Sequence, residues 1–136
     1  MTIEAELYVI GNGNQWRSKG TNTANLSTGI LNHAERKLYT EKRNVADNLV
    51  LIVQNAYPCT DCHNFFLEKS KNGVNIIIKV TDDQGSYGAE HGFELNKAPK
   101  TAIFYYRQGT HKIVTMTSTD RNPPLGFPDV PDFVDK

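Results

Sequence analysis

Two short motifs constrain this 136-residue chain more than any other feature of its sequence: H-A-E at residues 33–35 and P-C-T-D-C at residues 58–62. The histidine and the two cysteines offer one imidazole and two thiolates, a set that suits tetrahedral Zn²⁺ with its fourth position left to water. Bound zinc lowers the pKa of such a water from about 15.7 to roughly 7, and the glutamate can accept its proton. A fold that uses both motifs must bring them together. The predicted zinc ligands are His33, Cys59 and Cys62, and the predicted proton carrier is Glu35.

Each motif also has an alternative interpretation of its own. Asn32-x-x-Glu35 fits a capping box, in which Glu35 only satisfies the start of a helix. Residues 59–63 match C-x-x-C-H, the attachment pattern of a c-type haem, and a C-x-x-C pair also occurs in redox proteins. The haem interpretation leaves H-A-E unexplained, so the two motifs together favour a catalytic zinc site. A closed structural zinc site would need a fourth protein ligand, for which the candidates are His63, His91 and His111.

The hydrophobic pattern predicts a single domain over residues 1–119 and a proline-rich tail over residues 120–136 that is extended or partly disordered. Residues 3–10 alternate apolar and polar side chains, which is typical of a strand with one buried face. Residues 48–55 and 74–80 each contain an unbroken apolar run, which is typical of a strand buried on both faces. The core of the domain is therefore expected to be a sheet.

Two helices are predicted to begin at the two motifs. The first covers about residues 33–43, and the second begins at Pro58 and ends near Gly73. Because the second helix lies between two buried strands, those strands are expected to pair in parallel through a right-handed crossover. The other expected elements are a short strand within residues 15–30, a long loop with one turn of helix over 81–100, and a hairpin of strands 101–106 and 112–117.

The order H-A-E and then P-C-x-x-C resembles the zinc-dependent cytidine deaminase superfamily over about residues 30–65. Within it, the chain looks most like the deaminase domains of bacterial polymorphic toxins. The resemblance implies that His33, Cys59 and Cys62 hold zinc and that Glu35 is the general acid and base. It also implies a three-layer α/β/α fold, with helices on both sides of a mixed sheet of about five strands and a C-terminal antiparallel hairpin.

The function implied by the resemblance is hydrolytic deamination of cytosine to uracil in nucleic acid, with DNA favoured. A toxin domain would be delivered into the cytoplasm of a target cell and would have an immunity protein as a partner; otherwise the enzyme would be cytoplasmic. The alternatives are a deaminase of free cytidine or other nucleosides, a deaminase of adenosine in tRNA, and a zinc-stabilised binding module without catalytic activity.

The net charge of the chain limits the ways in which a nucleic acid could bind. Its 15 basic and 15 acidic residues give a net charge of zero, so any phosphate contact must come from a local patch. The sequence has no apolar run of the roughly 18 residues that span a membrane and no signal-peptide pattern, so a soluble monomer is expected. The candidate substrate contacts are Tyr57, Trp16, Asn32 and Tyr87, and the candidate phosphate contacts are Arg17, Lys19, Arg36, Lys37, Lys42 and Arg43.

Overall fold

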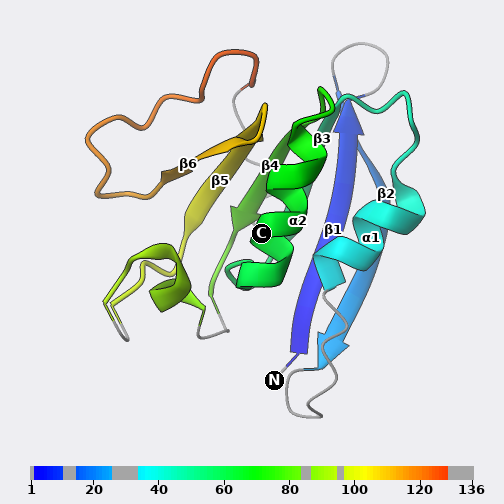
Figure 1. The fold of residues 1–136 in the computed structure, drawn as a ribbon. Helices are drawn as coiled ribbons and strands as arrows, with labels where there is room; N and C mark the ends of the chain where they lie inside the picture. The colour runs from blue at the N-terminus through cyan, green and yellow to red at the C-terminus, as the bar shows by residue number, and fades with distance from the viewer. Residues whose placement is uncertain (1, 11–14, 26–33, 84–86, 95–96, 129–136) are drawn as a thin grey trace.

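The structure is a computed structural model that describes residues 2–10, 15–25, 34–83, 87–94 and 97–128. Six strands of these residues form one mixed sheet in the order β2-β1-β3-β4-β5-β6 (Figure 1). No helix of the described residues is long and apolar enough to cross a membrane. The elements are β1 (Thr2–Ile10), β2 (Trp16–Asn25), α1 (Ala34–Lys42), β3 (Leu49–Gln54), α2 (Thr60–Ser70), β4 (Asn75–Val80), the 3₁₀ turn η3 (Gly88–His91), β5 (Ala102–Arg107) and β6 (Thr110–Val114).

The centre of the sheet is the parallel pair β3 and β4, with α2 as the connection between them. The pairing runs from Leu49 opposite Asn75 to Gln54 opposite Val80. The middle residues of both strands are buried on both faces of the sheet, which is why each strand carries an unbroken apolar run. The predicted parallel pair is therefore confirmed.

The edge strand β2 is longer than the sequence predicts. It covers ten residues although it contains Gly20, Asn22 and Asn25, because β1 pairs with it from Thr2 opposite Asn25 to Ile10 opposite Trp16. One irregularity interrupts this register between Leu7 and Tyr8. Pairing with a neighbouring strand thus outweighs the weak strand propensity of Gly and Asn.

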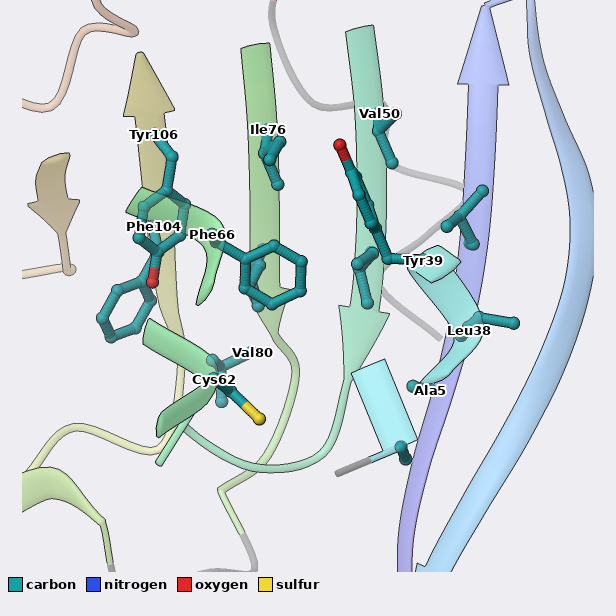
Figure 2. Packing of buried hydrophobic residues seen from close by; sticks show 14 of the residues in the cluster. Ala5, Leu38, Tyr39, Val50, Cys62, Phe66, Ile76, Val80, Phe104 and Tyr106 are labelled. Atoms are coloured by element: carbon teal, nitrogen blue, oxygen red, sulfur yellow. The ribbon is translucent and has the colours of Figure 1, made fainter. Parts of the chain in front are cut away.

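Both helices pack on the same face of the sheet. Leu38 and Tyr39 of α1 and Cys62 and Phe66 of α2 belong to one core cluster with the side chains of β1, β3, β4 and β5 that point toward the helices (Figure 2). On the opposite face, a smaller cluster is covered in part by Phe127. The expected helices on both sides of the sheet are therefore wrong for the described residues, although the mixed α/β class is confirmed.

Residues 120–128 cover part of the sheet face that carries neither α1 nor α2. Its prolines, at positions 123, 124 and 128, lack a backbone donor and disfavour a helix. Phe127 packs edge-on against Tyr105 with ring centroids 5.0 Å apart, and Asn75 Nδ2 donates to Gly126 O at 3.3 Å. The predicted tail thus lies along the sheet as far as residue 128, and residues 129–136 lie outside the described part.

The C-terminal hairpin of β5 and β6 is confirmed, with a tighter turn than expected. Gln108 and Gly109 connect the strands and have φ angles of 51° and 78°. Two residues with positive φ suit the type I′ turn, whose twist matches that of antiparallel strands. The turn therefore moves the second strand to Thr110–Val114, before the expected 112–117.

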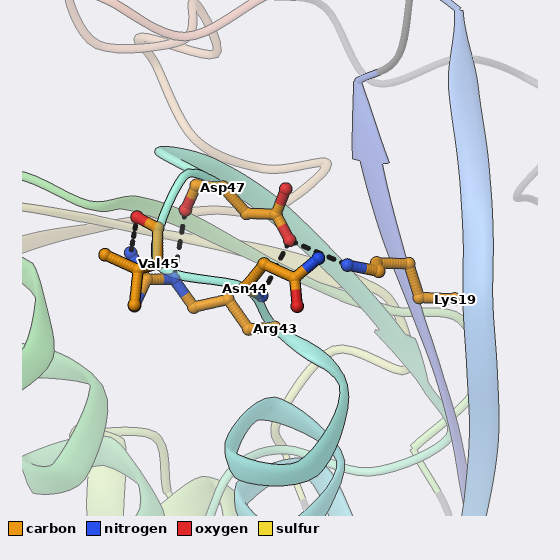
Figure 3. A network of polar contacts seen from close by, with 5 residues as sticks. All are labelled: Lys19, Arg43, Asn44, Val45 and Asp47. Atoms are coloured by element: carbon orange, nitrogen blue, oxygen red, sulfur yellow. Dashed lines mark hydrogen bonds and ion pairs between the residues drawn. The ribbon is translucent and has the colours of Figure 1, made fainter.

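A polar network connects the turn that follows α1 with strand β2 (Figure 3). Asp47 Oδ2 accepts from Lys19 Nζ and from Asn44 N, both at 2.9 Å, while Arg43 Nε donates to Asp47 O at 3.0 Å. Burial alone raises the pKa of the Asp47 carboxyl, but these hydrogen bonds and the charges of Lys19 and Arg43 outweigh it and lower the pKa. The ionised form of Asp47 is therefore the one that stabilises the fold.

We predict that Asp47→Asn lowers the free energy of unfolding by about 1–2 kcal/mol. Because the folded pKa lies below the unfolded value near 3.8, this contribution is complete above the unfolded pKa and is lost as pH falls through the folded one. Urea unfolding near neutral pH and in acid measures both effects. The control is Glu68→Gln, whose ion pair with Lys71 is exposed on both sides and is worth little. Equal losses in the two variants would contradict the prediction.

Candidate metal centre and active site

The two motifs meet where α1 and α2 begin. Glu35 is the second residue of α1, and Cys62 lies in the first turn of α2. Cys62 Sγ donates to Glu35 Oε1 at 3.4 Å, and the two side chains are buried, with 0% and 5% of their surface exposed. Figure 2 shows the Cys62 sulphur directed from α2 toward α1. A contact between residues 27 positions apart thus joins the carboxylate of one motif to a thiol of the other.

The start of α2 differs from the prediction by two residues. The helix begins at Thr60 and not at Pro58, and Cys59 is its N-cap with extended backbone angles (φ −68°, ψ 168°). An N-cap residue has non-helical angles although its carbonyl already accepts the first helical bond, here from His63 N at 2.8 Å. Cys59 and Cys62 also share a side-chain hydrogen bond. The two thiols therefore lie together at the N-terminus of the helix.

The Cys62 thiol is held in its neutral form by its surroundings. Its pKa is raised, first by the hydrogen bond with Cys59, then by burial and by the negative charge of Glu35. A divalent cation would reverse this balance, because it stabilises thiolates and offsets the repulsion between them and the carboxylate. A cation bound by the two cysteines would thus relieve the repulsion between their thiolates and the Glu35 carboxylate.

The described residues fit zinc in chemistry but supply only part of the ligand set. Two sulphur ligands favour zinc over hard cations such as Mg²⁺. Among the described residues, no group of three His, Cys, Asp or Glu side chains is arranged to hold a metal ion. The third predicted ligand, His33, lies outside the described part of the chain, as does Asn32. Of the three predicted ligands, the structure thus places Cys59 and Cys62.

Among the predicted substrate contacts, Tyr87 lies near the candidate centre. It is half-buried and packs against the core cluster that contains Cys62. Its pKa is raised by burial and then by the negative charges of Cys59, Glu90 and Glu35. Tyr87 therefore remains a candidate for contacting a bound base.

The other two described aromatic candidates are placed elsewhere. Tyr57 is only 1% exposed, and its hydroxyl donates to Pro99 O at 2.8 Å, so its ring cannot receive a base. Trp16 packs against the small cluster on the opposite face of the sheet, away from Cys62. Tyr57 lies in the loop between β3 and α2, and Trp16 is the first residue of β2. At neither position does the local sequence show which way the side chain points.

Three histidines pack their rings together in one cluster. The ring of His63 lies 4.9 Å from that of His91 and 4.5 Å from that of His111. His63 Nδ1 and Tyr106 OH share a hydrogen bond of 2.7 Å. Burial, followed by the charges of His111 and His91, lowers the pKa of His63 to about 4. In the described residues, none of the three is placed as the fourth ligand of a closed zinc site.

One member of the predicted basic cluster, Arg36, contacts Phe65 of α2. The Arg36 guanidinium lies 5.2 Å from the centre of the Phe65 ring, and Lys69 Nζ lies 5.3 Å from the same ring. Lys19 is instead paired with Asp47, and Arg43 lies over Tyr39. Lys69 was not among the predicted contacts, although Phe65 lies four residues before it in α2 and this helical spacing brings the two side chains together. Only the contact of Arg36 with Phe65 depends on the packing of the two helices.

Comparison with known proteins gives no relative on which to rest a function. No family model matches the sequence, and no curated protein or solved structure matches the chain. A function can therefore be inferred only from the two motifs and from the contacts that join them.

We predict one zinc ion per purified chain and its loss in Cys59→Ser and Cys62→Ser, with a lower melting temperature in both. Metal binding to a site that forms only on folding contributes directly to stability. Elemental analysis and thermal unfolding measure the two effects. Asp61→Asn is the matched control, because Asp61 is exposed and lies between the two cysteines. Well-folded wild-type protein that contains iron, haem or no metal would contradict the prediction.

Proposed function

We propose that this chain is a zinc-dependent deaminase that converts cytosine to uracil in nucleic acid, with DNA as its substrate. The observation that carries the proposal is the buried contact between Glu35 Oε1 and Cys62 Sγ at 3.4 Å, which joins the H-A-E motif to the P-C-x-x-C motif. A capping role for Glu35 alone, or a redox role for the cysteines alone, gives no reason for these two side chains to meet.

The chemistry divides between the metal and Glu35. Zinc, when bound, supplies a Lewis acid that lowers the pKa of water to roughly 7. Glu35 is buried beside the cysteines and can accept a proton from that water and deliver it to N3 of the base. The water oxygen adds at C4, and its remaining proton passes by way of Glu35 to the exocyclic amino group. The bond from C4 to that nitrogen then breaks, ammonia leaves, and uracil keeps the proton at N3. Tyr87, half-buried at the same site, is suited to contact the base.

The proposed contact surface for the rest of a nucleic acid lies on the two helices. The Phe65 ring of α2 has two cations near it, Arg36 of α1 and Lys69 of α2. Aromatic rings that receive unstacked bases and cations that contact phosphates are how proteins bind single strands. Because the net charge is zero, binding should depend on few phosphate contacts and weaken only gently with salt. These features favour a polymeric substrate over a free nucleoside.

The biological setting that we propose is a bacterial toxin domain. Such a domain acts in the cytoplasm of a target cell, and its producer would need an immunity protein that covers the active site. The proposal rests on the resemblance of the compact chain with its strand-rich ends to toxin deaminases. Deaminase assays on cytosine and adenine, free and within oligonucleotides, distinguish it from a nucleoside enzyme, a tRNA adenosine deaminase and an inactive zinc module.

We predict that Glu35→Gln removes deaminase activity, by about 10²-fold or more, while zinc content stays at the wild-type level. Glutamine has nearly the same size and can accept the hydrogen bond from Cys62, but it cannot carry the proton. Glu41→Gln, on the exposed side of α1, is the control. Loss of zinc together with activity would instead make Glu35 a ligand or a structural residue.

We also predict that Lys69→Ala weakens oligonucleotide binding by a similar factor for all base sequences. The slope of the logarithm of the binding constant against the logarithm of the salt concentration should decrease by the amount that corresponds to about one phosphate contact. Zinc content should not change, because Lys69 lies in the last turn of α2 and away from the cysteines. Lys71→Ala is the control, since Lys71 is exposed and paired with Glu68. Rapid turnover of free cytidine without activity on oligonucleotides would favour the nucleoside enzyme.

A further inference from the structure

The loop that carries the cysteines is held by residues that follow β4. Asp83 Oδ1 accepts from Tyr57 N at 3.1 Å. His91 Nε2 donates to Pro58 O at 2.6 Å. The next contact, at Thr60, is made by Glu90. Backbone groups on both sides of Cys59 are thus hydrogen-bonded to a single later segment of the chain.

Glu90 caps the N-terminus of α2 in place of the side chain of Cys59. Cys59 makes no side-chain capping hydrogen bond, although Ser, Thr, Asp or Asn at this position would normally bond to the first N–H groups of the helix. Glu90 Oε1 accepts from Thr60 N at 2.9 Å and also from the Thr60 hydroxyl. A carboxylate at a helix N-terminus is favoured by the helix dipole. The helix is therefore capped from η3, and the side chain of Cys59 is not required for capping.

The position of η3 is itself fixed by close packing. A Cβ added to Gly88 would lie 2.3 Å from the Cβ of Ala98, so the segment approaches its neighbour more closely than a larger residue would permit. The ring of His91 lies 4.9 Å from that of Phe104 and 4.9 Å from that of His63. Glu90 thus projects from a segment that is packed against the core.

We infer that Glu90 is a positioning residue for the metal centre: its hydrogen bonds to Thr60 cap α2 and hold Cys59 in the geometry that binds zinc together with Cys62. The inference rests on the proposed zinc site. Groups that orient metal ligands contribute to affinity although they do not touch the metal. A role for Glu90 through hydrogen bonding requires an acceptor oxygen at this position, not a negative charge.

The test measures zinc affinity by competition with a chelator and the thiolate-to-metal absorption of the Co²⁺-substituted protein. We expect Glu90→Ala to weaken zinc binding by about 10- to 100-fold and to change the Co²⁺ spectrum. Glu90→Gln keeps an acceptor oxygen and should recover most of the affinity. Thr60→Val removes one of the two donors and should produce a smaller loss, which also provides a test if Glu90→Ala does not fold.

The matched control is Glu94→Ala, because Glu94 lies in the same segment but is exposed and paired with Lys97. Its affinity and spectrum should equal those of the wild type. Wild-type affinity in Glu90→Ala, or an equal loss in Glu90→Gln or Glu94→Ala, would overturn the inference and leave the zinc site intact. Wild-type protein without any zinc affinity would overturn the proposed function as well.

Discussion

The parallel pairing of β3 with β4 is the constraint on which the rest of the structure depends. Parallel neighbours require a crossover, and here the crossover is α2. The loop that leaves β3 therefore has to start a helix that returns across the sheet, and the cysteine motif occupies that start. Residues 54–60 are thus placed at the carboxyl ends of the central strands, where ligand sites of α/β sheets are commonly found.

The placement of both helices on one face of the sheet is the second feature on which the candidate site depends. With α1 and α2 side by side on one face, their N-terminal ends can approach each other, and Glu35 reaches Cys62. If α1 packed on the opposite face, the sheet would separate the carboxylate from the thiol. The opposite face is covered in part by an extended segment that ends in Phe127, which leaves the helix side to form the candidate site.

The candidate site therefore has two levels of organisation. The contact between Glu35 and Cys62 brings the chemical groups together, whereas Asp83, Glu90 and His91 hold the backbone that presents them. The second level comes from a segment with little regular structure of its own. Its four-residue 3₁₀ turn is stabilised by packing against Tyr57 and Ala98, not by helix propensity.

The sequence by itself determined most of the local elements and the candidate chemical groups. Alternating or unbroken apolar runs marked β1, β3 and β4, a short motif marked the start of each helix, and the same motifs named Glu35, Cys59 and Cys62. Only the tertiary structure decided that both helices share one face, that Tyr57 is buried, and that Glu90 caps a helix 30 residues before it in the sequence. The physical reason is that these features depend on contacts between distant residues. Periodicity and capping preferences act over a few neighbouring positions and cannot specify such contacts.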